Sequence, residues 1–401
     1  MYILVKFISN LIHFKSKLMV SNSILYFDNA STTAVDDEVL FAMLPYFKEF
    51  YGNASSSHKF GVNINKEIES AKQRIADLIN SGSKEIVFTS GATESVNTVL
   101  KGIFNTDSKR NQIITVATEH SAVLETCQFL ENQGIDVVYL PVKANGIIDL
   151  EILKKNIGTQ TLIVCVMLVN NETGVIQPIK EIANIAHDNG ALMFTDATQA
   201  VGKMKVDVID LEVDFMAFSA HKFHGPKGIG GLFIKKQILK HFNALIHGGK
   251  HQDGLRSGTL NVPGIIGLGK ACEVANFQID NHKSITELRD LLESELLKIE
   301  GSFVNGDNEN RIYSITNICF PKIDSNIVIN MLDTICVSNG SACSSALIEP
   351  SYVLQAMGLN KEDAFSSIRF SLSKYNTREE VYALVEKLRE IIMQLKPLKH
   401  V

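Results

Sequence analysis

The chain has 401 residues, of which 45% are hydrophobic and 21% are charged, and its formal net charge is −5 at pH 7. This is the composition of an ordinary soluble globular protein with room for two domains, and the balance of charge gives no reason to expect nucleic acid or an anionic membrane as a partner. The six cysteines show neither CxxC nor Cys/His spacing. A zinc site and a disulfide framework are therefore not indicated, and a reducing cytoplasmic location fits best.

The first 27 residues contain no acidic residue, and Lys6 and His13 interrupt their apolar stretches. This pattern argues against a secretory signal, and no apolar run is long enough to span a membrane. If residues 1–20 were a transit peptide, the location would be mitochondrial or a related organelle, although the segment has no arginine. We favour a plain extension ahead of the folded part, with Met19 as an alternative start.

From Ile24 onward, short apolar runs alternate with helix-like segments. Apolar residues recur at three- and four-residue steps between Phe60 and Leu78, which predicts an amphipathic helix. Strands are predicted at 85–89, 113–117, 137–140, 162–169, 192–195, 215–218 and 229–234. Such alternation predicts a large, doubly wound α/β domain around a mostly parallel sheet, in which ligands bind beyond the carboxyl ends of the strands.

A mostly helical stretch at 265–299, with a polar break at 278–284, leads into a smaller α+β domain. Its predicted elements are strands at 312–320 and 368–372, a helix near 327–332, and a final helix with Val381, Leu384, Val385, Leu388, Ile391 and Leu395 on one face. We expect an N-terminal extension and entry to the small domain at 1–27, a large domain at 28–280 and a small C-terminal domain at 281–401.

The stretch 214–231 runs from an apolar strand into a Gly/Pro-rich turn that carries Ser219, His221, Lys222 and His224. A lysine at the end of a buried strand, beside a hydroxyl and imidazoles, can act as an amine nucleophile or form a Schiff base. Taken alone, Lys222 is more simply interpreted as a solvated turn lysine.

Two further strand ends carry groups that could bind different parts of a ligand. The turn 90–93 opens a helix, so its N–H groups and the Thr93 hydroxyl predict an anion site, although a simple N-cap has the same pattern. Asp196 ends a predicted strand, with Gln199 three residues later. A carboxylate there requires a cationic or N–H partner, and a structural ion pair is the alternative interpretation.

The remaining strand ends offer a histidine and two amides. His120 could stack on a planar ligand or shuttle protons, although a histidine satisfied within the core is equally consistent. Asn170 and Asn171 could donate to a ring oxygen or a substrate carboxylate, or could only form a turn. Together with the anion turn, Asp196 and Lys222, these residues predict pyridoxal 5′-phosphate (PLP) as cofactor, because PLP carries a phosphate, a pyridine nitrogen and an aldehyde.

These residues lie in a series of ordered motifs. The stretches are YFDNASTT (26–33), FTSGATES (88–95), EH (119–120), VNNETG (169–174), DATQ (196–199), SAHK (219–222), RSGTL (256–260), SNGSAC (338–343) and SSIRFS (366–371). The chain resembles a cysteine desulfurase of the NifS/IscS type, within the class V aminotransferase group of fold-type I PLP enzymes. The resemblance covers essentially everything from Tyr26 to about Leu395.

The resemblance implies a role for each matching residue. Lys222 would bind PLP as a Schiff base and Asp196 would pair with the pyridine nitrogen. Gln199 would donate to the ring hydroxyl, and His120 would lie over the ring and assist proton transfers. The phosphate would be held by Ala92, Thr93, Ser219, His221 and, from the other subunit of a homodimer, Thr259. Asn171 would contact cofactor and substrate, and Arg369 would bind the substrate's α-carboxylate as a bidentate pair.

Cys343 separates this reading from plain transamination. The resemblance implies that its thiolate takes the sulfur of L-cysteine as a persulfide, leaving L-alanine, and passes it to an acceptor protein such as an Fe–S scaffold. Cys343 could also contact a transferred Fe–S cluster. A buried, inert role suits Cys127, Cys165 and Cys319 better, while Cys336, predicted in a strand, is conceivable as a second sulfur-handling thiol.

Other activities use the same cofactor residues. Selenocysteine lyase, another class V aminotransferase-type reaction and a non-catalytic assembly partner stay open, and the acceptor could serve thiolation of tRNA or cofactors in place of Fe–S clusters. Two departures from the family pattern matter. Ala54 stands where the family usually has proline, and the chain stops at Val401, where housekeeping members carry a longer tail that helps to dock the scaffold.

Overall fold

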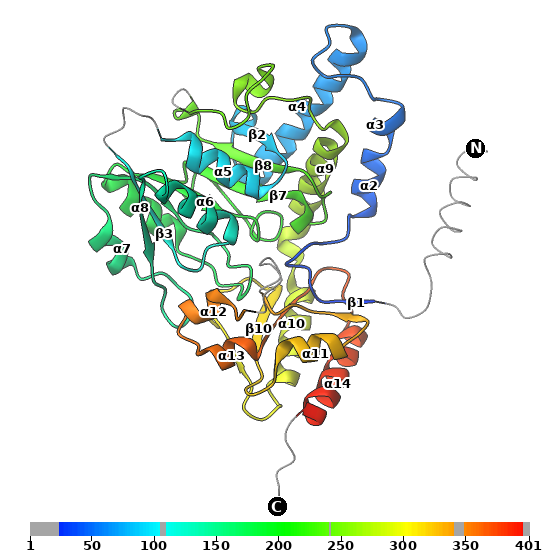
Figure 1. Cartoon of the computed structure of the whole chain (residues 1–401). Helices are drawn as coiled ribbons and strands as arrows, with labels where there is room; N and C mark the ends of the chain where they lie inside the picture. The colour runs from blue at the N-terminus through cyan, green and yellow to red at the C-terminus, as the bar shows by residue number, and fades with distance from the viewer. Residues whose placement is uncertain (1–23, 105–109, 240–241, 341–348, 396–401) are drawn as a thin grey trace, which may run out of the picture.

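The computed structural model describes residues 24–104, 110–239, 242–340 and 349–395 (Figure 1). Its largest feature is a seven-stranded sheet in the order β2-β8-β7-β6-β5-β3-β4. The strands are β2 (Ile86–Thr89), β3 (Gln112–Val116), β4 (Asp136–Leu140), β5 (Thr161–Cys165), β6 (Leu192–Asp196), β7 (Phe215–Ser219) and β8 (Gly230–Ile234). In this sheet β8 alone runs in the direction opposite to the other six strands, so the prediction of a mostly parallel α/β sheet is confirmed.

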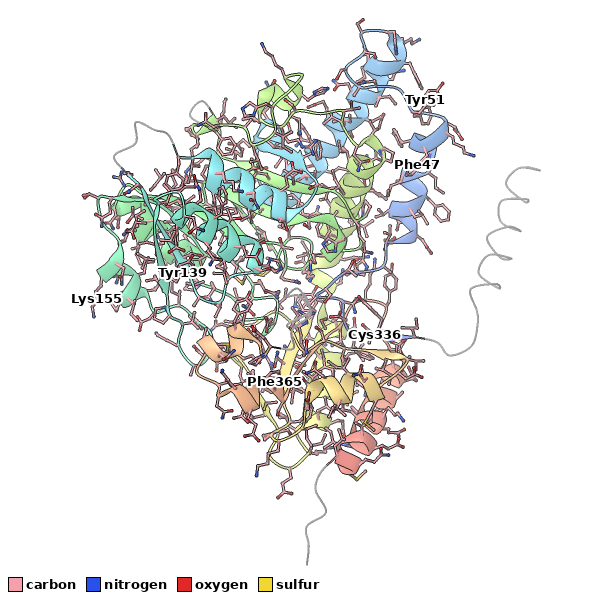
Figure 2. All side chains as sticks on the ribbon, viewed as in Figure 1. Phe47, Tyr51, Tyr139, Lys155, Cys336 and Phe365 are labelled. Atoms are coloured by element: carbon pink, nitrogen blue, oxygen red, sulfur yellow. The ribbon has the colours of Figure 1, made fainter. Side chains whose placement is uncertain are left out.

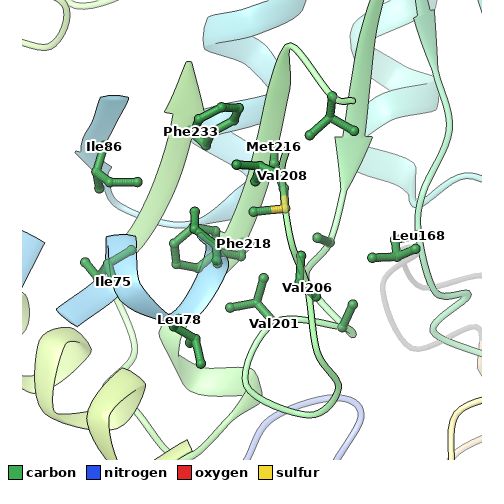
Figure 3. Close-up of a cluster of buried hydrophobic side chains, with 14 of the residues drawn as sticks. Ile75, Leu78, Ile86, Leu168, Val201, Val206, Val208, Met216, Phe218 and Phe233 are labelled. Carbon is green, nitrogen blue, oxygen red and sulfur yellow. The ribbon is translucent and has the colours of Figure 1, made fainter. Parts of the chain in front are cut away.

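Helices cover both faces of this sheet because its strands are buried on both sides. In β7, Met216 and Phe218 point into one core, whereas Phe215 and Ala217 point into the other. The first core, part of which Figure 3 shows around Phe218, receives α2 (Asp37–Met43), α4 (Lys59–Ile79), α7 (Leu150–Asn156), α8 (Ile179–Asp188) and α9 (Val262–Gln278). The second receives α5 (Ala92–Gly102) and α6 (Ser121–Glu131). The short α3 (Pro45–Lys48) lies between α2 and α4 along the chain.

Two predicted strands are shorter than expected. The strand predicted at 312–320 covers only Ile315–Cys319. The run 162–169 was expected to be a strand throughout, but β5 ends at Cys165. The N–H groups of Val166 and Leu168 still donate to carbonyls of β6 and its end, while Val169 forms an isolated bridge with Ile176. Apolar residues continue past the ladder because the segment stays buried, so hydrophobicity alone could not mark its end.

A third core lies in the lower part of Figure 1. It is built on a three-stranded antiparallel sheet of β9 (Phe303–Val304), β10 (Ile315–Cys319) and β12 (Ser367–Ser371). The helices of this part are α10 (Lys283–Leu296), α11 (Ser325–Met331), α12 (Tyr352–Ala356), α13 (Lys361–Phe365) and α14 (Arg378–Leu395). The chain enters here too, because β1 (Leu25–Tyr26) pairs with β11 (Ile335–Cys336). The separate cores support the proposed division near residue 280, which stays a prediction.

The described part of the chain contains no helix that is both long and apolar enough to cross a membrane. The carboxyl ends of β2, β3, β6 and β7 share one edge of the large sheet, since these strands are mutually parallel. The edge faces the small sheet, and β12 contributes to the same region.

Gly202 offers a test of the packing near this edge. Its φ is +77°, and an added Cβ would lie 2.5 Å from Cγ of the buried Phe223. Gly228 has a φ of +78° but nothing within 4 Å, so it is a matched control for backbone strain alone. We expect Gly202→Ala to lower the free energy of unfolding by about 1–3 kcal/mol more than Gly228→Ala, as measured by urea denaturation. Equal losses would show that the contact with Phe223 relaxes freely.

Candidate active site

A cavity of about 340 Å³ lies where the carboxyl ends of the large sheet meet β12. Such a volume is in the range of small-molecule sites. Its lining includes these predicted residues: Ala92, Thr93, His120, Asn171, Asp196, Gln199, Ser219, His221, Lys222 and Arg369. The structure therefore brings together residues that are separated by up to most of the chain.

Thr259 is a predicted site residue that is not among the lining of this cavity. Thr259 lines a different cavity, together with Tyr51 and Asn53. Cys343 lies outside the described residues, between the described Gly340 and the helix α12. Cys336 lies in β11 as predicted and is partly buried (Figure 2). Burial raises the pKa of its thiol, and Asp28 adds to the effect.

One end of the cavity presents hydrogen-bond donors from the start of α5. This helix begins at Ala92, whose N–H donates to Ser219 Oγ at 2.7 Å. The neighbouring His221 ring contacts the Thr32 hydroxyl through Nδ1 at 3.1 Å. Burial, assisted by the charge of Lys222, lowers the pKa of His221 to about 4, so this imidazole is neutral at physiological pH. The helix N-terminus, the hydroxyls of Ser219 and Thr32, and the neutral imidazole of His221 together suit an anion such as phosphate.

His120 has a defined tautomer. It caps α6, with Nδ1 accepting a hydrogen bond from the Ala122 N–H at 3.1 Å. Burial lowers the pKa of the imidazole, with Asp196 opposing and Lys222 adding to this shift. The neutral ring must then carry its proton on Nε2. His120 can therefore offer an N–H donor to the cavity, as the sequence analysis expected of a proton-transfer group.

Lys222 ends a 3-10 turn (Ala220–Lys222) directly after β7. Its Nζ donates to the carbonyl oxygens of Ala30 and Ser31, both at 2.8 Å. The N-terminal segment, which pairs with the small sheet, thus fixes the lysine that belongs to the large one. The amine points into the cavity from a rigid strand end, which is a suitable origin for a nucleophile.

Asp196 contributes a buried carboxyl group to the cavity lining, and a second buried carboxyl group, that of Glu119, interacts with it electrostatically. Asp196 accepts a hydrogen bond from the Thr198 N–H through Oδ1 at 2.9 Å. The neighbouring Glu119 is fully buried, and its Oε1 accepts from the Met167 N–H at 2.6 Å. Its Oε2 has no hydrogen-bond partner among the described residues. Burial raises the pKa of Glu119 well above its usual range, and Asp196 contributes, so the site favours the protonated form of this carboxyl group.

Arg369 brings a buried guanidinium from β12 to the same cavity. One terminal nitrogen donates to Asp28 Oδ1 at 2.7 Å and to Ser31 Oγ at 2.6 Å, and the other donates to the Asn171 carbonyl at 2.9 Å. Its Nε has no partner among the described residues. An arginine held in place with donor capacity remaining is suited to bind a carboxylate.

Asn170, by contrast, is structural. Its Oδ1 accepts from the N–H groups of Glu172 and Thr173, and its Nδ2 donates to the Thr118 carbonyl. The turn interpretation is therefore right for Asn170, while Asn171 lines the cavity. Sequence reasoning left Ala30 and Ser31 without a role, although they lie in the quoted 26–33 motif. It also missed Lys203, whose only signal was a lysine inside the otherwise apolar run 200–204.

These residues fit PLP. An anion-binding end, a strand-end carboxylate and a lysine line one cavity, and they match the cofactor's phosphate, pyridine nitrogen and aldehyde in turn. Asp196 would hold the pyridine nitrogen, and Lys222 would hold the aldehyde carbon. Ala92, Thr93, Ser219 and His221 would hold the phosphate.

Comparison with known proteins gives a consistent result. Residues 25–384 match the model of the aminotransferase class-V family. The chain is 44% identical over 378 residues to cysteine desulfurase IscS of Ehrlichia chaffeensis, covering 93% of this chain and 92% of that one. It is 43% identical to the protein of the same name from Dechloromonas aromatica, with 93% of both chains covered.

Solved structures agree with the sequence matches. A NifS-like protein superposes with a TM-score of 0.87 at 39% identity, covering 93% of this chain and all 100% of that chain. SspA, solved in complex with cysteine, superposes with a TM-score of 0.78 at 34% identity, covering 88% of this chain and 100% of that chain.

Proposed function

Since the chain belongs to the aminotransferase class-V family, we propose that it is a PLP-dependent cysteine desulfurase. It would convert L-cysteine into L-alanine and hold the sulfur as a persulfide on Cys343. Relatives about 44% identical over most of the chain carry the name cysteine desulfurase, which supports this activity. The family-level resemblance predicted from the motifs is confirmed by the match to residues 25–384.

One observation carries the proposal. Ser31 accepts from Lys222 through its carbonyl and from Arg369 through its hydroxyl, both in the same cavity. Ser31 thereby fixes the position of the Lys222 amine, which would bind the cofactor, relative to the Arg369 guanidinium, which would bind an α-carboxylate. This is the pair of groups that an α-amino acid substrate requires.

Each residue has a distinct part in the reaction. When bound, PLP would supply an aldehyde for an amine and a ring that accepts the electron pair left at Cα. Lys222 Nζ would take the Cα proton, and Asp196 would keep the pyridine nitrogen protonated. Arg369 and Asn171 would orient the substrate carboxylate. His120 Nε2, which carries the proton of the neutral ring, would donate it where charge develops on the substrate.

The sulfur step balances without an external oxidant. The Cys343 sulfur forms a bond to Sγ of the substrate while the Cβ–Sγ bond breaks. Cβ gains the electron pair and a proton and becomes the methyl group of alanine, while the two sulfurs share the corresponding oxidation. The persulfide then passes to an acceptor, for which we propose a protein of Fe–S cluster assembly or of thiolation.

A homodimer with shared sites is part of the proposal. Phe41, Phe47, Phe50 and Tyr51 on and after α2–α3 are each about half exposed or more, and Figure 2 places Phe47 and Tyr51 at the outer edge. Exposed aromatic side chains gathered in one region support an interface there. Thr259 lines a cavity with Tyr51, so the same interface would carry Thr259 toward the phosphate of the partner's site. We also propose a cytoplasmic location, supported by the unpaired state of the described cysteines.

The experiment that tests the function is mass spectrometry of the PLP-loaded protein after addition of L-cysteine. We expect the mass of one sulfur atom on the peptide that contains Cys343, together with alanine in solution in equal amount. Keto-acid formation without a persulfide would indicate an aminotransferase-type reaction, and selenide release with no response to cysteine would indicate a selenocysteine lyase. Either result would contradict the proposal.

A further inference from the structure

Lys203 lies behind the cofactor lysine, in the loop between β6 and β7. It lines a second cavity, of about 230 Å³, whose lining comes from both the large-sheet part and the small-sheet part of the chain. Lys222 lines both this cavity and the active-site cavity. The second cavity has no carboxylate in its lining, which also includes His224, His282 and Lys374. Lys203 therefore shares with Lys222 a cavity that is distinct from the active-site cavity.

The hydrogen bonds of Lys203 lead directly to Lys222. Its Nζ donates to Gln199 Oε1 at 2.6 Å. An ammonium is a donor only, so it fixes the amide with the oxygen toward Lys203 and the nitrogen away from it. Gln199 Nε2 then donates to the Ala30 carbonyl at 2.8 Å, and the same carbonyl accepts from Lys222 Nζ.

Lys203 has no compensating acid. No carboxylate of the described ranges forms an ion pair with it, and its hydrogen bond goes to a neutral amide. Burial lowers the pKa of Lys203 to about 7, and the charges of Lys222 and Arg369 contribute. A lysine without an acid partner in such surroundings costs stability, and groups of this kind gather at functional sites.

We propose that Lys203 is a positioning residue for Lys222, acting through Gln199 and through its own charge. This inference rests on the proposed PLP-dependent function and deepens it. The ammonium of Lys203 would hold the Gln199 amide in the orientation that presents Nε2 to Ala30 and to the cavity. Its charge would also favour the unprotonated form of the Lys222 nitrogen, because a neighbouring cation makes a second positive charge unfavourable.

Several other titratable or charged groups surround Lys203. His221 and His224 have pKa values lowered to about 4, mainly by burial, so both are neutral near pH 7. Lys374 is paired with Asp36. Arg369 remains charged throughout, and His282 stacks on Tyr313. Among these groups Lys203 is the one whose hydrogen bonds lead through Gln199 and Ala30 to Lys222.

The test uses the absorbance of the PLP-loaded enzyme without substrate, recorded against pH. Protonation of the Lys222 nitrogen changes this absorbance, so the spectrum gives its midpoint directly. We expect Lys203→Met to raise the midpoint by about one pH unit, a tenfold change in proton affinity. Lys203→Arg retains a donor-only cation and should stay close to wild type. Lys205→Met removes an exposed lysine two residues away and should leave the midpoint unchanged.

An unshifted midpoint in Lys203→Met would overturn the inference, as would an equal shift in Lys203→Arg. Should Lys203→Met fail to fold, Lys203→Gln replaces it, because it also removes the charge and is expected to give the same upward shift. The two hypotheses fail differently. Loss of the proposed function would appear in the wild type, as an absence of bound PLP or of persulfide. Failure of the Lys203 inference would appear only in the midpoint of the variants.

Discussion

Lys222→Ala is expected to abolish the absorbance of covalently held PLP and to lower the turnover of L-cysteine by more than about 10³-fold. The amine has two roles in the proposed reaction, because it holds the cofactor and takes the Cα proton. No other described lysine lines the active-site cavity, so none can replace it there. The measurement is an absorbance spectrum after incubation with PLP and removal of the free cofactor, followed by an assay for alanine.

Lys222→Arg is the matched variant for this prediction. It retains a cation near the carbonyls of Ala30 and Ser31, which accept from Lys222 in the wild type. A guanidinium remains protonated and is a poor nucleophile, so we expect the covalent absorbance to be lost here as well. Retention of a covalent PLP adduct in either variant would contradict the assignment of Lys222.

Cys343→Ser is expected to eliminate the persulfide and to reduce sulfur transfer to an acceptor below detection. The absorbance of bound PLP should stay the same, because Cys343 has no proposed part in holding the cofactor. A serine hydroxyl is similar in size but cannot accept sulfur at neutral pH. The measurement combines mass spectrometry of the protein with an assay for sulfide in the presence of a reducing thiol.

Cys336→Ser is the control for Cys343→Ser. Cys336 lies in β11, where it pairs with Tyr26, and burial raises the pKa of its thiol, which makes it a poor nucleophile at neutral pH. We expect Cys336→Ser to retain the persulfide on Cys343 and most of the turnover. Undiminished sulfide release from Cys343→Ser would contradict the proposed function. A persulfide found on Cys336 would show that the assignment of the sulfur acceptor to Cys343 is wrong.

The general fold and much of the site follow from local patterns. Alternating strand-like and helix-like segments predicted the α/β sheet, because burial on both faces leaves continuous apolar strands such as β7. The polar residues that follow those strands predicted the site, since the carboxyl ends of parallel strands share one edge. Asp196 and Lys222 both come from this rule. The roles proposed for these two residues came from the whole series of ordered motifs, because no single motif would have indicated them.

Other features depend on contacts that no local pattern encodes. Ser31 accepts hydrogen bonds from both Lys222 and Arg369, which are far from it and from each other in the sequence. Only the folded molecule shows that these two side chains bind the same residue. The raised pKa of Glu119 arises from complete burial, and the Nε2 tautomer of His120 arises from its role as a helix cap.

The sequence by itself pointed to Lys222 as the candidate nucleophile and predicted PLP as its cofactor, because strand ends and motifs are local properties of the chain. The tertiary structure alone decided how Lys222 is held. Its amine is bound by Ala30 and Ser31, in the N-terminal segment whose Asp28 bridges to β12, and Lys203 lines a cavity that Lys222 also lines. The electrostatic environment of a side chain depends on which distant segments pack around it, and that packing exists only after the hydrophobic cores have formed.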